Sequence, residues 1–184
     1  MVAIGAAVID IKAVSVVETR LWTFLVPEDA WEPRSVDQFW SKFPAQRHAL
    51  TNDPATLVTP AEFVDAWTTW TTDVKARAGT VSVPLWSDFP AFDLAWLSLI
   101  LVRGGGKPCY FAPPAFEWQS TLDIDAFVEG VRASMSLDPT KATKLESTLA
   151  NGKALYPDGD HYPDKDAACM GLRFAHLLWA LSLS

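Results

Sequence analysis

The first 26 residues contain two runs of small and β-branched side chains, residues 2–10 (VAIGAAVID) and residues 14–26 (VSVVETRLWTFLV). The break between them is short, so the two runs predict antiparallel strands joined by a tight turn. The first run is apolar at nearly every position, which indicates a strand buried on both faces. Such a strand needs a layer packed on each side of its sheet, and this requirement limits the chain to a few layered architectures.

The rest of the chain alternates helical and extended patterns. Thr59 and Glu62 have the spacing of a capping box, and they predict a helix that ends at Gly79. The apolar face of this helix comprises Phe63, Ala66, Trp67 and Trp70. The other expected elements are helices at 35–43, 90–102, 121–133 and 165–183, strands at 81–86 and 109–112, and a mobile polar connection at 138–160. This order predicts an α/β fold, a mixed β-sheet flanked by helices.

Size and charge narrow the class of protein. The 184 residues are 49% hydrophobic and 20% charged, which predicts one compact domain over residues 1–184 and no disordered segment. The net charge of −7 argues against a broad basic face for nucleic acid. It leaves open an enzyme that binds the end of a nucleic-acid strand through bound metal ions, because acidic side chains are the ligands such ions need.

The cysteines and the apolar segments at the two ends of the chain do not indicate a particular function. Cys109 and Cys169 lie far apart and in no metal-ligand spacing, so we expect two reduced thiols. The apolar C-terminal stretch is interrupted by Arg173 and His176, which predicts a buried helix and no membrane span. No basic segment precedes the apolar residues 1–11, so a secretory signal is not expected. A soluble, cytoplasmic protein is the resulting expectation.

Residues 86–97 (WSDFPAFDLAWL) place a carboxylate in the first turns of an apolar helix, directly after a strand. Asp93 is the polar exception between Phe92 and Leu94. Taken alone, this pattern favours a side chain that complements the helix dipole, and the alternative is a functional carboxylate in a cleft. Asp88 either caps this helix, which we favour, or lies beside a bound strand.

Residues 161–167 (HYPDKDA) form a second candidate segment, immediately before the last helix. Pro163 keeps His161 on the loop side, while Asp166 falls in the first helical turn. A fixed carboxylate next to a histidine suits metal binding combined with general-base chemistry. Taken alone, however, the segment favours the alternative, an exposed loop histidine beside an acidic helix start.

Considered together, the two segments resemble the second and third motifs of the DEDDh 3′→5′ exonucleases, a superfamily with the RNase H-like fold. The resemblance rests on Phe92-Asp93 opening a helix after a strand, and on His161-x-x-x-x-Asp166 opening the final helix. Residues 87–93 (SDFPAFD) and 39–44 (FWSKFP) are similar to the phage-type and bacterial exoribonuclease branch. Residues 2–10 resemble the second strand of the family, usually written with Ile-Gly-Ala.

The resemblance implies an RNase H-like mixed sheet and two-metal phosphodiester hydrolysis at the 3′ end of single-stranded DNA or RNA, releasing nucleoside 5′-monophosphates. Asp93 and Asp166 would hold two Mg²⁺ or Mn²⁺ ions, and His161 would accept a proton from the attacking water. Relatives often form dimers, so a homodimer is consistent with the resemblance. The positions that the resemblance places near the substrate are Asp88, Phe89 and Phe92.

One part of the family pattern is absent. Its Asp-x-Glu motif belongs to the strand before Ile-Gly-Ala, and this chain starts at Met1 on what resembles the second strand. Asp10 falls at the hairpin turn and Glu18 on the outgoing strand, so neither is expected to replace the motif. We therefore expect a fold that lacks its first strand. Three explanations remain: a start codon assigned too late, which we favour, a truncated relative, or a partner that supplies the strand.

The missing motif gives weight to an alternative function, a catalytically silent exonuclease-fold module that binds nucleic acid or a protein partner. Trp31, Trp40 and Trp118 lie outside clear core positions and are candidates for stacking or contact surfaces. Most of the nine tryptophans are nevertheless expected in the core.

Overall fold

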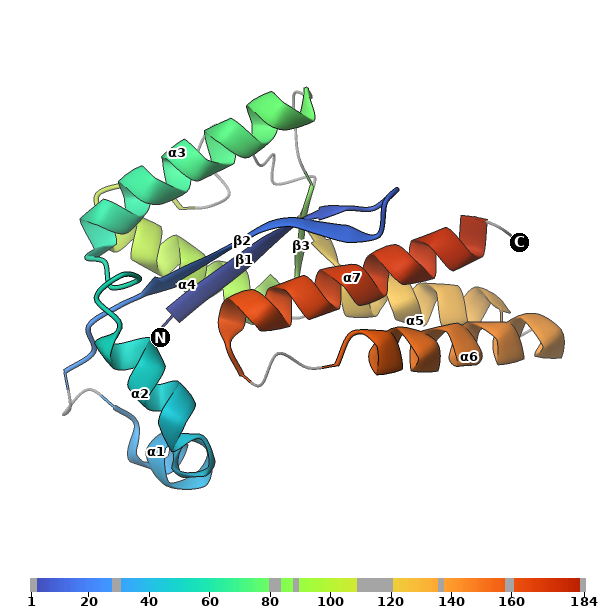
Figure 1. The fold of residues 1–184 in the computed structure, drawn as a ribbon, viewed down its shortest axis with the longest axis horizontal. Coiled ribbons are helices and arrows are strands. Elements are labelled where there is room, and N and C mark those ends of the chain that lie inside the picture. The colour runs from blue at the N-terminus through green and yellow to red at the C-terminus, as the bar shows by residue number, and fades with distance from the viewer. Residues whose placement is uncertain are drawn as a thin grey trace.

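The structure is a computed structural model, and it describes residues 3–27, 31–79, 84–87, 90–108, 121–135, 138–157 and 161–182. The chain is a mixed α/β protein with more helix than strand (Figure 1). Its elements in order are β1 (Ala3–Asp10), β2 (Ser15–Thr23), α1 (Pro33–Gln38), the 3₁₀ turn η2 (Trp40–Lys42), α2 (Pro44–Asn52), α3 (Pro60–Ala78), β3 (Leu85–Ser87), α4 (Pro90–Arg103), β4 (Thr121–Asp123), α5 (Ile124–Met135), α6 (Pro139–Leu155) and α7 (Pro163–Ser182).

The expected N-terminal hairpin is confirmed. Strands β1 and β2 pair antiparallel, from Ala3 opposite Thr23 to Asp10 opposite Ser15, with a register shift after Val8. The Oδ1 atom of Asp10 accepts hydrogen bonds from the backbone N–H groups of the next turn residues, at 2.9 and 3.0 Å. The carboxylate of Asp10 therefore has a local role in the turn, as is common for aspartate at such positions.

Helix α7 covers one face of β1 and runs in the same direction as the strand (Figure 1). A Cβ atom added to Gly5 would lie 2.0 Å from the carbonyl carbon of Pro163, and one added to Gly171 would lie 2.5 Å from the Ile9 side chain. From Gly5 to Ile9 the strand rises about 13 Å, and from Pro163 to Gly171 the helix rises about 12 Å. The two elements therefore run side by side over nearly the same length. Gly5 in β1 and Gly171 in α7 therefore permit the close approach of strand and helix.

The opposite face of β1 contributes to the main hydrophobic core. Ile4, Ala6 and Val8 pack against buried residues of β2, α3 and α4. Alternate residues of a strand point to opposite faces, so β1 lies between α7 and this core, as expected for a strand covered on both sides. Its residues are nevertheless half-buried at best, and among the described strands β1 pairs only with β2. One long edge of β1 is thus without a strand partner in the described part of the chain.

Aromatic side chains dominate the main core. The ring of Trp22 contacts those of Phe63, Trp67 and Trp70 with centroids 5.4, 5.7 and 5.6 Å apart. These rings meet edge-on or tilted, the geometry that their quadrupoles favour. The predicted apolar face of α3 is confirmed, and each buried side chain of this size contributes about 1.5–3 kcal/mol through burial. The buried members of this core are Trp22, Phe24, Phe63, Trp67, Trp70, Val74, Leu94, Leu97, Ile100 and Leu101.

Both ends of α3 follow the sequence prediction. The Thr59 side chain accepts from the Glu62 backbone, and the Glu62 side chain accepts from the Thr59 backbone at 2.8 Å, which completes the capping box. Hydrogen bonds from the backbone and side chain of Thr59 lower the pKa of Glu62. Gly79 ends the helix in the left-handed conformation, with φ of 62°.

Glu18 on β2 ties the hairpin to α3. Its carboxylate accepts hydrogen bonds from the indole Nε1 of Trp70 at 2.6 Å and from Arg77 at 2.5 Å. Arg20 lies 3.7 Å from the same carboxylate. Partial burial raises the pKa of Glu18, but the hydrogen bonds from Arg77 and Trp70 and the charges of Arg77 and Arg20 outweigh it, so the pKa is lowered overall. Glu18 is therefore a structural ion-pair residue.

The second pair of strands is parallel. Leu85 in β3 pairs with Thr121 in β4, and α4 follows β3 with Arg103 in its last turn. The helix expected at 121–133 is wrong at its start, because the first three residues pair with β3 and helix α5 begins only afterwards. The strand expected at 81–86 is described only from residue 84, and the one at 109–112 lies outside the described residues.

Two helices were not predicted. Pro44 was expected to end a helix, but it occupies the first turn of α2, a position that tolerates proline because no helical N–H is needed there. The connection at 138–160, expected to be polar and mobile, instead contains α6. Asp138 caps this helix by accepting from two backbone N–H groups at 2.9 and 3.3 Å. Helix α6 packs against α7, with Leu145 buried.

Candidate active site

Asp93 lies in the first turn of α4, where the sequence placed it. Its Oδ2 atom accepts a hydrogen bond of 2.5 Å from the hydroxyl of Ser87, the last residue of β3. The carboxylate is half-buried, and a negative charge here also complements the positive end of the helix dipole. The bond to Ser87 fixes Asp93 relative to the end of the strand, which is a contact that sequence reasoning did not foresee.

Asp166 lies in the first turn of α7, and its backbone N–H donates to the carbonyl of Tyr162 at 2.8 Å. The side chain is half-buried. Beside it, the ammonium of Lys165 lies 4.2 Å from the ring centroid of Tyr162, within the range of a cation–π contact. The close approach of Pro163 to Gly5 places this first turn directly over β1.

His161 is exposed and adopts a positive φ of 62°, which is uncommon for a residue with a side chain. Its imidazole packs against two phenylalanines from a distant part of the chain. The centroid distances are 4.2 Å to Phe43 and 5.1 Å to Phe39, both in T-shaped contacts. The sequence predicted a loop histidine but gave no signal that residues 39 and 43 would reach it.

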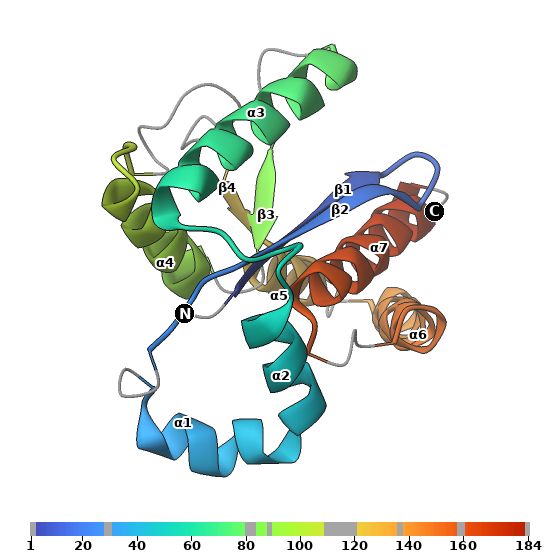
Figure 2. The ribbon, with the colours of Figure 1, turned by 60° about the vertical axis from the view of Figure 1, so that its left-hand side comes forward.

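Asp93 and Asp166 belong to helices that lie on opposite faces of β1. Leu94, the neighbour of Asp93, is buried in the core beneath the even-numbered residues of β1, whereas the start of α7 lies on the odd-numbered side at Gly5. Figures 1 and 2 show α4 and α7 on opposite sides of the hairpin, with α7 packed along β1. The two predicted carboxylates therefore belong to helix starts that flank one strand.

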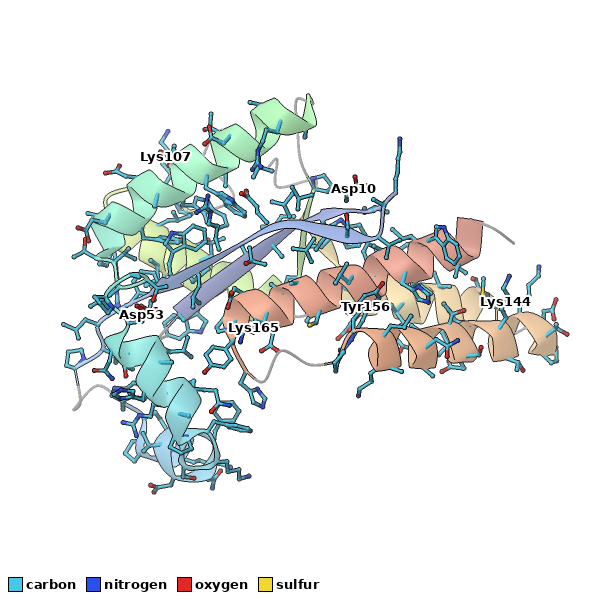
Figure 3. All side chains as sticks on the ribbon, viewed as in Figure 1. Asp10, Asp53, Lys107, Lys144, Tyr156 and Lys165 are labelled. Atoms are coloured by element: carbon cyan, nitrogen blue, oxygen red, sulfur yellow. The ribbon has the colours of Figure 1, made fainter. Side chains whose placement is uncertain are left out.

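The other acidic candidates do not join them. Asp10 lies at the turn end of the hairpin, at the opposite end of β1 from Lys165 and the start of α7 (Figure 3). Glu18 is held by Trp70 and Arg77. Asp88 and Phe89 lie outside the described residues, and so does the side chain of Phe92.

The donor chemistry of the two aspartates suits a divalent cation such as Mg²⁺ or Mn²⁺, which prefers carboxylate oxygens. Within the described ranges, however, no three His, Cys, Asp or Glu residues form a group that could hold a metal ion. Asp93 and Asp166 thus lie in the first turns of two different helices, and the described residues do not by themselves fit a two-ion centre.

Comparisons of the chain with models of protein families, with curated proteins and with solved structures found no match. The function proposed below is therefore based on the geometry of the site. In the described part of the chain, no helix has both the length and the apolar composition required to cross a bilayer.

Proposed function

We propose that the chain is a metal-dependent 3′→5′ exonuclease with an RNase H-like fold, acting on single-stranded DNA or RNA. The observation that carries the proposal is the placement of Asp93 and Asp166. Each occupies the first turn of a helix, and the two helices begin on opposite faces of β1. Two carboxylates that are distant in sequence thus lie in the first turns of helices on either side of one strand.

The strand arrangement is consistent with the proposed fold. An RNase H-like sheet combines an antiparallel hairpin with parallel strands, and both pairings are present here. In the resembled fold, one further strand separates the hairpin from the parallel pair. Leu85 of β3 packs against the same core as Ile4 and Ala6 of β1, although β1 and β3 are not paired to each other. A strand inserted between them would join the two sheets over this shared core.

Each site residue has a role in the proposed reaction. Asp93 and Asp166 would each supply a carboxylate ligand to a pair of Mg²⁺ or Mn²⁺ ions, which would also need ligands other than the described residues, and the ions would supply Lewis-acid polarisation of the phosphodiester. His161 is exposed, and its imidazole would accept the proton of the attacking water. The water oxygen bonds to phosphorus as the bond from phosphorus to the 3′ oxygen breaks. The 3′ oxygen leaves and takes a proton from solvent, and a nucleoside 5′-monophosphate is released.

Titration with Mn²⁺ tests the assignment of the two carboxylates without reference to activity. Asp93→Asn and Asp166→Asn should each lower the affinity for Mn²⁺ by about tenfold or more, because each removes a charged oxygen ligand. Asp65→Asn, on an exposed position of α3, is the matched control and should bind as the wild type does. Unchanged Mn²⁺ affinity in both folded site variants would overturn the assignment.

The second candidate function, a catalytically silent module that binds nucleic acid or a protein partner, is favoured by a separate observation. The guanidinium of Arg47 lies 4.5 Å from the ring centroid of Trp31, and Trp31 contacts Trp40 at 6.0 Å. Aromatic rings beside a cationic side chain suit single-stranded nucleic acid. Trp118 lies outside the described residues. Oligonucleotide binding that is lost in Trp31→Ala, without cleavage in any divalent metal, would favour this function over the exonuclease.

A further inference from the structure

The segment 31–52, here called the aromatic lobe, projects from the rest of the molecule and contains α1, η2 and α2 (Figures 1 and 2). Its rings form a continuous series of contacts. Phe43 meets Phe39 at 5.1 Å, Phe39 meets Trp40 at 5.0 Å, and Trp40 meets Trp31 at 6.0 Å. The lobe is therefore held together by ring packing, with Leu50 as its buried aliphatic side chain.

This series of rings contacts the rest of the protein at His161. Within the described part of the chain, the ring contacts that join the aromatic lobe to other segments are those of Phe39 and Phe43 with His161. The closer contact is with Phe43, whose ring centroid lies 4.2 Å from that of the imidazole. The position of the imidazole is thus coupled to the lobe and not only to its own loop.

The backbone around His161 does little to fix its side chain. The residue has a left-handed φ of 62° and lies two residues before the start of α7. An exposed side chain on such a loop samples several rotamers. Contacts with two aromatic rings remove that freedom, because rotation about the side-chain bonds would separate the imidazole from both of them. A conformation of this kind persists where the surroundings enforce it.

We propose that Phe43, supported by Phe39, is a positioning residue that holds the His161 imidazole in place for proton transfer. The inference rests on the proposed function, in which His161 is the general base. A general base must stay within hydrogen-bond reach of the water it deprotonates, and a small displacement lowers the rate strongly. Phe43 does not touch the reacting atoms in this account and acts only through His161.

Kinetics of cleavage provide the first test. Phe43→Ala should lower kcat about tenfold and leave KM unchanged, because it affects the base and not the binding of the strand. Phe43→Tyr keeps the ring and should restore most of kcat. In a His161→Ala background, Phe43→Ala should cause no further loss, since the residue through which it acts is gone. A full additional loss in the double variant would overturn the positioning role.

Proton NMR of the histidine ring provides a second test that does not depend on activity. The chain has three histidines, and the His161 signals are identified by their loss in His161→Ala. Removal of the Phe43 ring current should shift the His161 ring protons, whereas Phe43→Tyr should leave them near the wild-type position. Unchanged His161 signals in folded Phe43→Ala would overturn the inference. A wild-type chain that shows the ring-current shift but cleaves nothing would instead overturn the proposed function and, with it, the role of Phe43 in proton transfer.

Discussion

Pro163, the first residue of α7, lies against the backbone of Gly5 in β1, so closely that a Cβ atom on Gly5 would be 2.0 Å from the proline carbonyl carbon. The same added atom would be 2.2 Å from the backbone nitrogen of Asp164. Both neighbours are backbone atoms and cannot move aside as a flexible side chain would. This contact determines where the first turn of α7, with Asp166, sits over the hairpin.

Gly5→Ala should therefore destabilise the protein by more than about 2 kcal/mol, because the helix must shift to relieve the overlap. The same variant should weaken Mn²⁺ binding, since it displaces Asp166. Gly130→Ala in α5 is the matched control: no atom lies within 4 Å of its added Cβ, and it should be neutral or slightly stabilising. Urea unfolding of the three proteins measures the difference. Equal stability of Gly5→Ala and the wild type would show that α7 does not sit so close to β1.

The ion pair of Glu18 makes a prediction about pH. The pKa of Glu18 lies below its ordinary value of 4.5, so the folded state binds fewer protons than the unfolded state near that pH. The stabilisation is therefore present above the ordinary pKa and is lost as the pH falls through the lowered one. Glu18→Gln should cost about 1 kcal/mol at neutral pH, a modest value because Arg77 is half-exposed and screened by solvent.

Denaturation of the wild type and Glu18→Gln across a range of pH checks this sign. The difference in unfolding free energy should be constant at pH values well above 4.5, the ordinary pKa of Glu18, and should shrink as the pH falls below it. A difference that grows on acidification would contradict the assignment of Glu18 as an ionised acceptor for Arg77 and Trp70.

Asp138 tests the helix that the sequence did not predict. Its side chain caps α6, and Asp138→Ala should cost about 1 kcal/mol by leaving two backbone N–H groups without this acceptor. Asparagine is an equally good capping residue, so Asp138→Asn should retain nearly all of the stability. Thermal unfolding followed by circular dichroism distinguishes the two. If both variants lose the same stability, the charge of Asp138 matters and the cap does not.

The parts of the fold that the sequence predicted correctly have strong local signals. The hairpin follows from two β-branched runs around a short break, and the ends of α3 follow from the Thr59–Glu62 capping box and Gly79. Helix α6 was missed because it buries only Leu145 and Gly152, which leaves its apolar pattern too weak to outweigh its polar composition. Strand β4 has three residues, and it depends on pairing with β3, which is remote in sequence.

The candidate site was predictable one residue at a time, but its assembly was not. Asp93 and Asp166 lie in first helical turns as expected, since proline and the order of apolar residues mark those helix starts. The bond from Ser87 to Asp93 and the contact of Phe43 with His161 depend on tertiary packing. Neither has a signature in local sequence. The RNase H-like fold, the exonuclease activity, the bound ions and a homodimer remain predictions.

The most direct test of the exonuclease is a gel assay with a 5′-labelled single-stranded oligonucleotide in Mn²⁺, with EDTA and Asp166→Asn as parallel reactions. Our account predicts a ladder of products that shorten from the 3′ end, absent in EDTA and absent in Asp166→Asn. Substrate that stays at full length in Mn²⁺, with a wild-type chain shown by circular dichroism to be folded, would contradict it.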